Sequence, residues 1–348
     1  MDVRRGRRGR AVAIVGAVVA ISTLSASCGE TEVRFASEPT QQPAGSESDH
    51  VRIAAAGDAV CDAPAGPTSS LCQYAATSDL LVSDDVDAVF MLGDAQYPNG
   101  RYGDFLQYYD PTWGRARVKT FPVLGNHEYE TVSGEPRGYF RYFGDRFRGP
   151  SGHGYYSFEL PEGCSPSDGM CWHVIALNSD LCFLDPGCGG PMTDGSASPG
   201  QRQIRWLTDD LAAHPEADYP CTIAFFHEPL FYSSGVYEEV RPLWDALYSA
   251  NVDIVLNGHR HNYERWQPLA PTGVRDDELG MRQFIVGTGG ANLEPLGGHP
   301  PELAKAQAQA LGVLELDLYP NEYTWRWVPA AGQPTDFKDV SVRPAPCV

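Results

Sequence analysis

The sequence lacks several patterns that would assign its class directly. It has no C-x-x-C pair, so thiolate metal ligation is a poor explanation for its cysteines. It has no H-E-x-x-H run, the motif of many zinc metalloproteases, and no internal repeat. What remains is a chain of 348 residues with 42% apolar residues, long enough for one large or two small packed domains.

Positive charge is also scarce. The chain has 26 Lys and Arg against 45 Asp and Glu, a net charge of -19, and five of the Arg lie within the first ten residues. We therefore expect no binding of nucleic acid or anionic lipid through the bulk surface. The acidic residues are expected mainly to keep the surface soluble. An anionic substrate would need local positive charge, which metal ions can supply.

The N-terminus has no apolar run that would span a bilayer comfortably. The uncharged stretch 11–24 is short, follows the Arg cluster and precedes small residues and Cys28. This order predicts a signal peptide at residues 1–28 and an exported protein. Cys28 resembles a lipoprotein cleavage site, which would anchor the protein by lipid at the extracellular face of the membrane. Ser25 departs from that pattern, and ordinary cleavage with secretion is the alternative.

Residues 29–49 are rich in Ser, Thr, Glu, Gln, Pro and Gly, which predicts a flexible linker before a folded domain at 50–348. Beyond Cys28 the chain has eight cysteines, and an even number in an exported chain suggests up to four disulfides. Sequence alone does not fix the pairing. Short loops favour these pairs, the last by elimination: Cys61–Cys72, Cys164–Cys171, Cys182–Cys188 and Cys221–Cys347.

Apolar runs alternate with helical patterns along this domain, which predicts an α/β fold with a sheet covered by helices. The expected strands are short and mostly apolar: 51–56, 88–92, 121–124, 172–177, 222–226, 252–256 and 283–286. Helical spacing of apolar residues occurs at 69–82, 201–213 and 238–250. Residues 312–318 and 322–328 are expected to form a closing hairpin on a second sheet.

Five polar runs each follow an apolar run. They are G-D at Asp58, G-D-A-Q-Y at Asp94 to Tyr97, G-N-H-E at Asn126 to Glu128, H-E-P at His227, and G-H-R-H at His259 to His261. In open α/β sheets, ligands bind beyond the carboxyl ends of the strands, so these distant side chains are expected to converge there.

The side chains in these runs suit two metal ions better than one. A phenolate such as that of Tyr97 is a hard anionic donor for a trivalent ion, whereas imidazoles and an amide oxygen suit a divalent one. A carboxylate such as Asp94 can bridge the two cations. Two metals roughly 3.5–4 Å apart can clamp a phosphate, lower the pKa of a bound water and stabilise the leaving oxygen.

The ordered set of runs resembles the calcineurin-like metallophosphoesterase superfamily. The Tyr of G-D-A-Q-Y and the run G-H-R-H-N-Y-E-R at 258–265 resemble its purple acid phosphatase branch. The resemblance implies two packed mixed β-sheets flanked by helices, a four-layer sandwich with the dimetal site at the sheet edges. Two positions depart from the family pattern. Ala-Val-Cys follows Asp58, and Glu228 stands where many relatives have a second His.

The resemblance also implies a role for each residue. Fe(III) would be held by Asp58, Tyr97 and His261; the divalent ion (Zn, Mn or Fe) would be held by Asn126, His227 and His259; and Asp94 would bridge both ions. His127 would be catalytic, contacting the phosphate or protonating the leaving group.

The expected activity is that of an acid phosphatase, which hydrolyses small phosphate monoesters with a metal-bound hydroxide. A phosphodiesterase or nucleotidase on the same site is the first alternative, because the metals are indifferent to the ester's second substituent. A non-catalytic surface protein that binds metal or phosphate is the second. The sequence carries no prediction of the oligomeric state.

Overall fold

The computed structural model describes residues 50–61, 72–185, 187–190, 197–333 and 336–347. The predicted signal peptide, Cys28 and the predicted linker lie outside the described residues. The chain divides into two units at Glu47 and Ser48, and the following description concerns the second unit alone. Within the described ranges, no helix is both long enough and apolar enough to cross a membrane.

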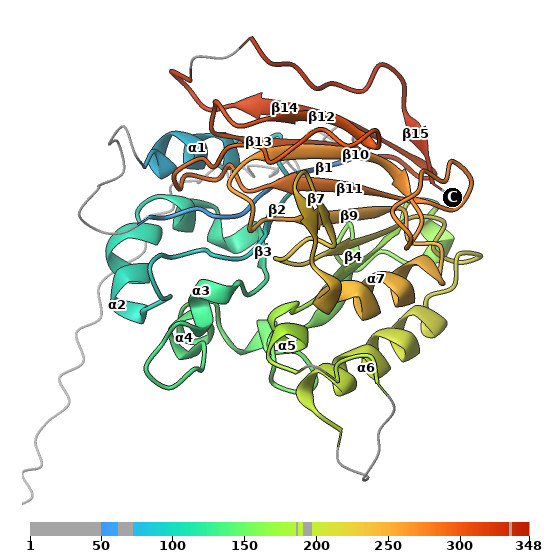
Figure 1. The fold of residues 1–348 in the computed structure, drawn as a ribbon, viewed down its shortest axis with the longest axis horizontal. Coiled ribbons are helices and arrows are strands. Elements are labelled where there is room, and N and C mark those ends of the chain that lie inside the picture. The colour runs from blue at the N-terminus through green and yellow to red at the C-terminus, as the bar shows by residue number, and fades with distance from the viewer. Residues whose placement is uncertain (1–49, 62–71, 186, 191–196, 334–335, 348) are drawn as a thin grey trace, which may run out of the picture. The chain divides into compact units, whose positions relative to one another are not determined.

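The first sheet has six strands and joins the two ends of the domain (Figure 1). In spatial order it contains β15 (Ala345–Pro346), β14 (Glu322–Pro329), β13 (Gly312–Leu318), β1 (Val51–Ala56), β2 (Ala88–Met91) and β3 (Thr120–Pro122). Strands β1, β2 and β3 are parallel, and β13 runs antiparallel to β1. The predicted hairpin is therefore present as β13 and β14, but its placement on a second sheet is wrong. It pairs directly with β1, in antiparallel register from Val51–Leu318 to Ala55–Leu314.

The second sheet has seven strands. In spatial order it contains β12 (Leu303–Gln307), β10 (Tyr263–Leu269), β11 (Met281–Val286), β9 (Ile254–Asn257), β6 (Thr222–Phe225), β5 (Trp172–Ala176) and β4 (Tyr156–Leu160). Its central strands β5, β6, β9 and β11 are parallel. The flanking strands β4, β10 and β12 are antiparallel and were not predicted. They carry polar and partly exposed residues and so lack the apolar run typical of a strand buried on both faces.

Side chains alternate between two apolar cores along the central strands. On β5, Val174 faces a core between the two sheets, and Ile175 faces a second core under helices. On β6, Phe225 likewise faces the core between the sheets, and Ala224 faces the core under the helices. The helices are α1 (Tyr74–Leu81), α2 (Tyr102–Asp104), α3 (Asn126–Tyr129), α4 (Arg137–Phe143), α5 (Asp180–Phe183), α6 (Pro199–Ala213) and α7 (Arg241–Tyr248).

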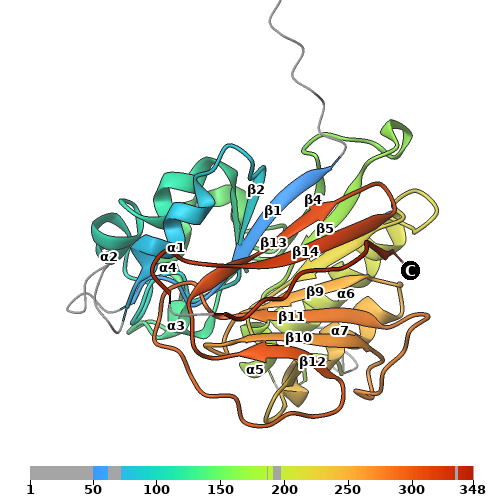
Figure 2. The ribbon, with the colours of Figure 1, turned by 90° about the horizontal axis from the view of Figure 1, so that it is seen from above.

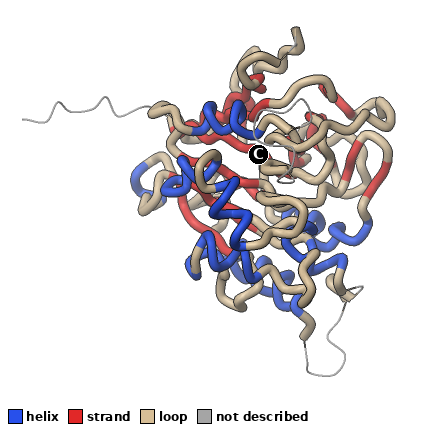
Figure 3. Tube along the Cα trace, turned by 90° about the vertical axis from the view of Figure 1, so that its left-hand side faces the viewer, coloured by secondary structure: helices blue, strands red, loops and turns tan. Residues whose placement is uncertain are grey.

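Helices α6 and α7 contribute Leu207, Leu243 and Trp244 to the second core and cover the outer face of the second sheet (Figure 2). Tyr74 and Leu81 of α1 pack on the first core. The arrangement is the predicted one, two mixed sheets flanked by helices. The loops that connect the elements, tan in Figure 3, include the segments after the parallel strands.

All four expected disulfides are present: Cys61–Cys72, Cys164–Cys171, Cys182–Cys188 and Cys221–Cys347. The pairing that short loops favoured is therefore confirmed. The last bridge joins the start of β6 to the C-terminal segment, across a sequence separation of 126 residues. Closing so long a loop restricts the unfolded chain most, so this bridge is expected to contribute most to stability.

Candidate dimetal site

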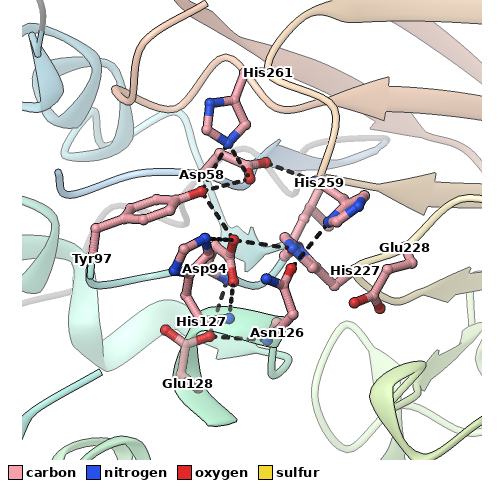
Figure 4. A network of polar contacts seen from close by, with 12 residues as sticks. Asp58, Asp94, Tyr97, Asn126, His127, Glu128, His227, Glu228, His259 and His261 are labelled. Carbon is pink, nitrogen blue, oxygen red and sulfur yellow. Dashed lines mark hydrogen bonds and ion pairs between the residues drawn. The ribbon is translucent and has the colours of Figure 1, made fainter. Parts of the chain in front are cut away.

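The carboxyl ends of the parallel strands bring all five polar runs together (Figure 4). Asp58 follows β1 and Asp94 follows β2, while Asn126 opens α3 just after β3. His227 follows β6, and the G-H-R-H run connects β9 to β10. The two sheets meet at this edge, where the amide of Gly57 donates a 2.9 Å hydrogen bond to the carbonyl of Val286. The eight residues predicted to form the site therefore lie in one cluster.

The Tyr97 hydroxyl is the centre of one half of the cluster. It lies 2.9 Å from Asp58 Oδ1, 2.9 Å from Asp94 Oδ2 and 2.9 Å from His261 Nε2. Asp58 Oδ1 is in turn 3.2 Å from His261 Nε2. Burial and the neighbouring carboxylates raise the pKa of Tyr97 well above its ordinary value. A cation in this half would therefore be needed to draw off the phenol proton.

The other half contains Asn126, His227 and His259. His259 Nδ1 lies 3.0 Å from Asn126 Oδ1, and the His259 ring packs edge-on against the His227 ring. Asp94 lies between the halves, because its Oδ2 is 3.3 Å from His227 Nε2 as well as 2.9 Å from the Tyr97 hydroxyl. The facing donors thus lie in two groups, with Asp94 in contact with both.

Backbone carbonyls fix the orientation of two imidazoles. Nδ1 of His227 lies 2.8 Å from the carbonyl oxygen of Leu92, and Nδ1 of His261 lies 2.7 Å from that of Asn292. A carbonyl oxygen only accepts, so Nδ1 must carry the proton in both rings. Nε2 then offers its lone pair to the cluster, the second-shell arrangement found for most metal-bound histidines.

The donor set fits metal ions in three respects. The distances of 2.9–3.3 Å between facing donor atoms match neighbouring ligands of a cation bound at roughly 2.0–2.2 Å. Nε2 of His227 is buried and makes no well-aligned hydrogen bond within the described part of the chain, although Asp94 Oδ2 lies 3.3 Å away. The carboxylates of Asp58 and Asp94 are both buried, and such charges ordinarily need a compensating partner.

Without cations, protons on the imidazoles carry the compensating charge. Burial opposes ionisation of Asp94, but the positive charge of His227 lowers its pKa below the ordinary value. Burial lowers the pKa of His227 in the first instance, yet the Asp94 carboxylate raises it well above the ordinary value. A bound metal ion would take the place of the proton on His227 and would itself compensate the charge of Asp94.

The backbone is strained at three of the candidate ligands. Asp58, Asp94 and His259 have φ values of 58°, 49° and 68°, in the left-handed region that non-glycine residues rarely adopt. Such strain persists where surrounding structure enforces it, commonly at functional sites. Gly93 has φ of +86°, and a Cβ there would lie 2.5 Å from His227 Nδ1. Only glycine therefore allows the β2 loop to pass so close to that ring.

His127 lies at the rim of the cluster and not among its facing donors. Its Nε2 is 3.9 Å from Asp94 Oδ2, and its side chain is 27% exposed. The Pro98 carbonyl, 2.8 Å from Nδ1, turns the opposite edge of the ring towards the cluster. Its backbone amide donates to Asp94 Oδ1 at 2.9 Å, so the residue also orients that carboxylate. This position is suited to proton transfer at Nε2.

The sequence reasoning missed the contribution of Glu128. This fully buried carboxylate accepts hydrogen bonds from the amides of Asp94 at 3.0 Å, Ala95 at 2.9 Å and Gly125 at 2.9 Å. It thereby ties the loop after β2 to the start of α3, and so fixes Asp94 relative to Asn126. The signal was present in G-N-H-E, because a Glu at the third helical position can cap the helix that Asn126 opens.

Glu228, the position that departs from the family pattern, is buried beside His227. Its carboxylate accepts a hydrogen bond from the Ser179 hydroxyl, and its amide donates to that hydroxyl at 3.1 Å. Asp180 is nearby and 5% exposed. Burial raises the pKa of both carboxyl groups, and the Glu228 carboxylate raises that of Asp180 further. The position where many relatives have a second His is thus occupied by a buried carboxyl group that Ser179 holds in place.

Comparison with protein families gives one match that covers most of the domain. The model of the calcineurin-like phosphoesterase family matches residues 51–263, which include all five polar runs. The chain belongs to the calcineurin-like phosphoesterase family. The resemblance inferred from the motifs is thus confirmed, and metal-dependent phosphoester hydrolysis is the chemistry of this family.

Curated relatives of this phosphoesterase include purple acid phosphatases. The probable purple acid phosphatase 20 of Arabidopsis thaliana is 28% identical over 234 residues, 61% of this chain and 47% of that protein. The acid phosphatase type 7 of Homo sapiens is 28% identical over 207 residues, 53% of this chain and 41% of that protein. The phosphoesterase therefore spans about half the length of the curated relatives it matches.

Solved structures confirm the fold of the phosphoesterase. A purple acid phosphatase from yellow lupin seeds aligns with a TM-score of 0.60 at 17% identity, covering 84% of this chain and 53% of that one. GAP50, described as the anchor in the inner membrane complex of Plasmodium, also aligns with a TM-score of 0.60, at 12% identity. A fold shared with an anchor does not decide activity, so the argument for function depends on the site.

Proposed function

We propose that this protein hydrolyses phosphate monoesters at a two-metal centre, as an acid phosphatase does. The observation that carries the proposal is the position of Asp94 between two sets of facing donors. One set offers a phenol, a carboxylate and an imidazole, and the other offers an amide and two imidazoles. One carboxylate common to two such sets is the arrangement expected of a bridged pair of cations.

The chemistry of the donors supports an unequal pair of metals. Asp58, Tyr97 and His261 would hold a ferric ion, because phenolate and carboxylate are hard anionic ligands. Asn126, His227 and His259 would hold zinc, manganese or ferrous iron. When bound, the two ions supply positive charge against the phosphate and make a water acidic enough to serve as nucleophile.

The protein's own residues position the reaction and move a proton. His127 would contact the phosphate and give a proton from Nε2 to the departing alkoxide, since this ring edge faces the cluster. Glu128 holds the loops that carry Asp94 and Asn126 in fixed register. Burial of Asp58, Asp94 and His227 keeps water from the inner part of the site and strengthens the charge interactions made there.

Export and anchoring complete the proposal. Four disulfides support an oxidising compartment outside the cytosol. The predicted signal peptide would deliver the protein there, and a lipid on Cys28 would keep it at the extracellular face. Mass spectrometry of the N-terminal peptide of the mature protein tests this: a diacylglyceryl-modified Cys28 supports the anchor, and an unmodified N-terminus excludes it.

Hydrolysis of 4-nitrophenyl phosphate by the metal-loaded protein tests the activity. We expect Asp94→Asn to reduce kcat/KM at least about 10³-fold, because the common carboxylate of the two donor sets is lost. The matched control is Asp210→Asn, which changes a carboxylate of α6 that contacts His173 and Ser157 instead. Equal rates in wild type and Asp94→Asn would refute the proposal.

One observation favours the alternative activity, hydrolysis of larger phosphate esters. A cavity of about 360 Å³ is lined by Tyr129 at the end of α3, together with Phe140, Arg148 and His153. Tyr129 is two residues from His127, so a bulky organic group could extend from the site into this cavity. A panel containing 5′-nucleotides and diesters decides between these activities, and tight phosphate binding without turnover would indicate a non-catalytic protein.

A further inference from the structure

Arg260 brings a positive charge to a site whose other charged groups are carboxylates and imidazoles. It stands between the candidate ligands His259 and His261 in G-H-R-H. Neither the chemistry of the metals nor the family resemblance assigns it a role. The backbone of both neighbouring residues is held by the site, since the amide of His259 donates to Asp58 Oδ2 at 2.8 Å. The start of the Arg260 side chain is therefore fixed beside the cluster.

Contacts with two loops fix the position of the Arg260 guanidinium group. Arg260 Nη2 lies 3.1 Å from Glu294 Oε2, and the amide of Glu294 donates to the carbonyl of His261 at 2.8 Å. On the other side, the guanidinium carbon lies 5.2 Å from the centre of the Tyr232 ring. Tyr237, whose hydroxyl shares a hydrogen bond with Arg260, stacks on Tyr232 at 4.5 Å.

Tyr237 connects this group directly to a candidate ligand. Its ring packs edge-on against His259, with 5.3 Å between ring centres. Arg260 therefore lies on the His259 side of the cluster, whereas His127 packs on Tyr97 at 4.4 Å on the other side. Arg260 is thus connected to the cluster through Tyr237 and His259, and His127 through Tyr97.

The contacts of Arg260 leave donors for a substrate. A guanidinium has five N–H donors in a planar fork that matches phosphate oxygens. Among the described residues, Arg260 Nε is buried without a hydrogen-bond partner, but the side chain as a whole is 24% exposed, so the donors open to a substrate are those of the outer guanidinium nitrogens. The ion pair with Glu294 is half-exposed on the Glu294 side, and such pairs contribute little to stability. Replacing the Glu294 carboxylate at Arg260 by a substrate phosphate therefore costs little free energy.

We propose that Arg260 binds the phosphate of the substrate from the His259 side and selects phosphate monoesters over diesters. A monoester carries a charge of about −1.5 to −2 at neutral pH and has three terminal oxygens. A diester carries a single charge, and its second substituent replaces one oxygen that the guanidinium would contact. This inference rests on the proposed phosphohydrolase activity and names the substrate class of that site.

The test compares 4-nitrophenyl phosphate with bis(4-nitrophenyl) phosphate on the metal-loaded full chain. Arg260→Ala is expected to lower kcat/KM for the monoester about tenfold to hundredfold, the usual effect of losing one charged hydrogen-bonding group. The diester rate should change less than about threefold, because it lacks the second charge. The inhibition constant of inorganic phosphate should rise in parallel with the loss on the monoester.

Two further variants separate charge from shape and from folding. Arg260→Lys keeps the charge but loses the planar fork, and we expect an intermediate effect. Glu294→Gln removes the competing carboxylate without touching Arg260, and we expect phosphate to bind severalfold more tightly. The control is Arg275→Ala, which removes an exposed Arg paired with Asp277 beyond the far end of β10.

The outcomes distinguish this inference from the proposed activity. Equal losses on both esters, or none on either, in Arg260→Ala would overturn the assignment of Arg260 while the activity stands. If wild type hydrolyses neither ester, the proposed activity fails. Calorimetric titration with inorganic phosphate then decides the binding role: weaker binding in Arg260→Ala supports it, and unchanged binding overturns it.

Discussion

Two clusters of histidine and carboxylate in this molecule lead to opposite expectations. The first is the candidate dimetal site at the carboxyl ends of the strands. The second contains His173 at the start of β5, Asp210 and His214 at the end of α6, and Glu159 on β4. Both bring metal-binding residue types within a few ångströms of each other. Composition alone would therefore propose a metal at either place.

The imidazoles of the second cluster do not converge on one point. The rings of His173 and His214 stack at 3.9 Å with 11° between their planes. Because the nitrogen lone pairs lie in the plane of each ring, two stacked rings cannot both direct them at one ion. His173 Nε2 is also occupied by Asp210 Oδ2 at 2.8 Å. In the first cluster, backbone carbonyls hold Nδ1 and leave Nε2 of His227 and His261 turned inward.

The largest expected difference is in metal content. We expect about two metal ions per chain in wild type and at most one in His227→Ala, because one donor set loses its most buried ligand. His173→Ala should retain both ions. Elemental analysis of protein purified without added metal measures this. Loss of an ion in His173→Ala would show that the second cluster binds metal and that ring stacking is no barrier.

A second difference concerns colour. A Tyr97–Fe(III) bond should give a visible charge-transfer band in the iron-loaded protein, and Tyr97→Phe should abolish it. Tyr219 is the matched control, since its ring lies 5.1 Å from His214 in the second cluster. Tyr219→Phe should leave the band unchanged. A colourless, active enzyme without iron would refute the ferric assignment and leave the proposed hydrolysis intact.

The order of side chains along the sequence predicted the first cluster because parallel strands share an edge. A residue that directly follows such a strand is placed by the strand itself, which is why Asp58, Asp94 and His227 could be brought together across 170 residues of sequence. The partners that depend on loop conformation were not predictable in this way. Ser179 contacts Glu228, and Glu294 contacts His261, through turns whose course no periodicity encodes.

The misplaced hairpin has a related cause. The sequence pattern of residues 312–328 predicts two strands that pair with each other. It does not predict which other strand of a sheet this hairpin pairs with. The pairing of β13 with β1 depends on contacts between residues more than 250 positions apart. Strands β10 and β12 were missed because they are flanking strands with polar faces. Sequence pattern thus predicts elements buried on both faces better than those at a sheet's margin.

The clusters should also differ in what they contribute to stability. His173 is fully buried, and His173→Ala would leave a cavity and a nearly buried Asp210 without its imidazole partner. We expect a loss of about 2–4 kcal/mol in the free energy of unfolding. His127→Ala, at the rim of the first cluster, should lose less than about 1 kcal/mol while reducing activity. Denaturant unfolding measures both, and equal losses would contradict the division between a structural and a functional cluster.

The smallest expected effect separates two histidines within the first cluster. Burial, reinforced by the charge of His227, lowers the pKa of His259 to about 4. Burial would also lower the pKa of His261, but the carboxylate of Asp58 raises it to about 9. The folded, metal-free protein therefore binds fewer protons at His259, and more at His261, than the unfolded chain, in which histidine has a pKa of about 6.5.

The two shifts give the metal-free protein a stability maximum near neutral pH. Stability from His261 is fully present below about pH 6.5 and is lost as the pH rises towards 9, whereas stability from His259 is lost as the pH falls from about 6.5 towards 4. We expect Tm to fall by roughly 3–5 °C on each side. His261→Gln should reduce the alkaline limb, to which the raised pKa of His227 also contributes, and leave the acid limb unchanged. Bound metal should remove the alkaline limb, because both imidazoles must be deprotonated to act as ligands. An alkaline limb of unchanged size in His261→Gln would assign it to His227 alone and remove the distinction between His259 and His261.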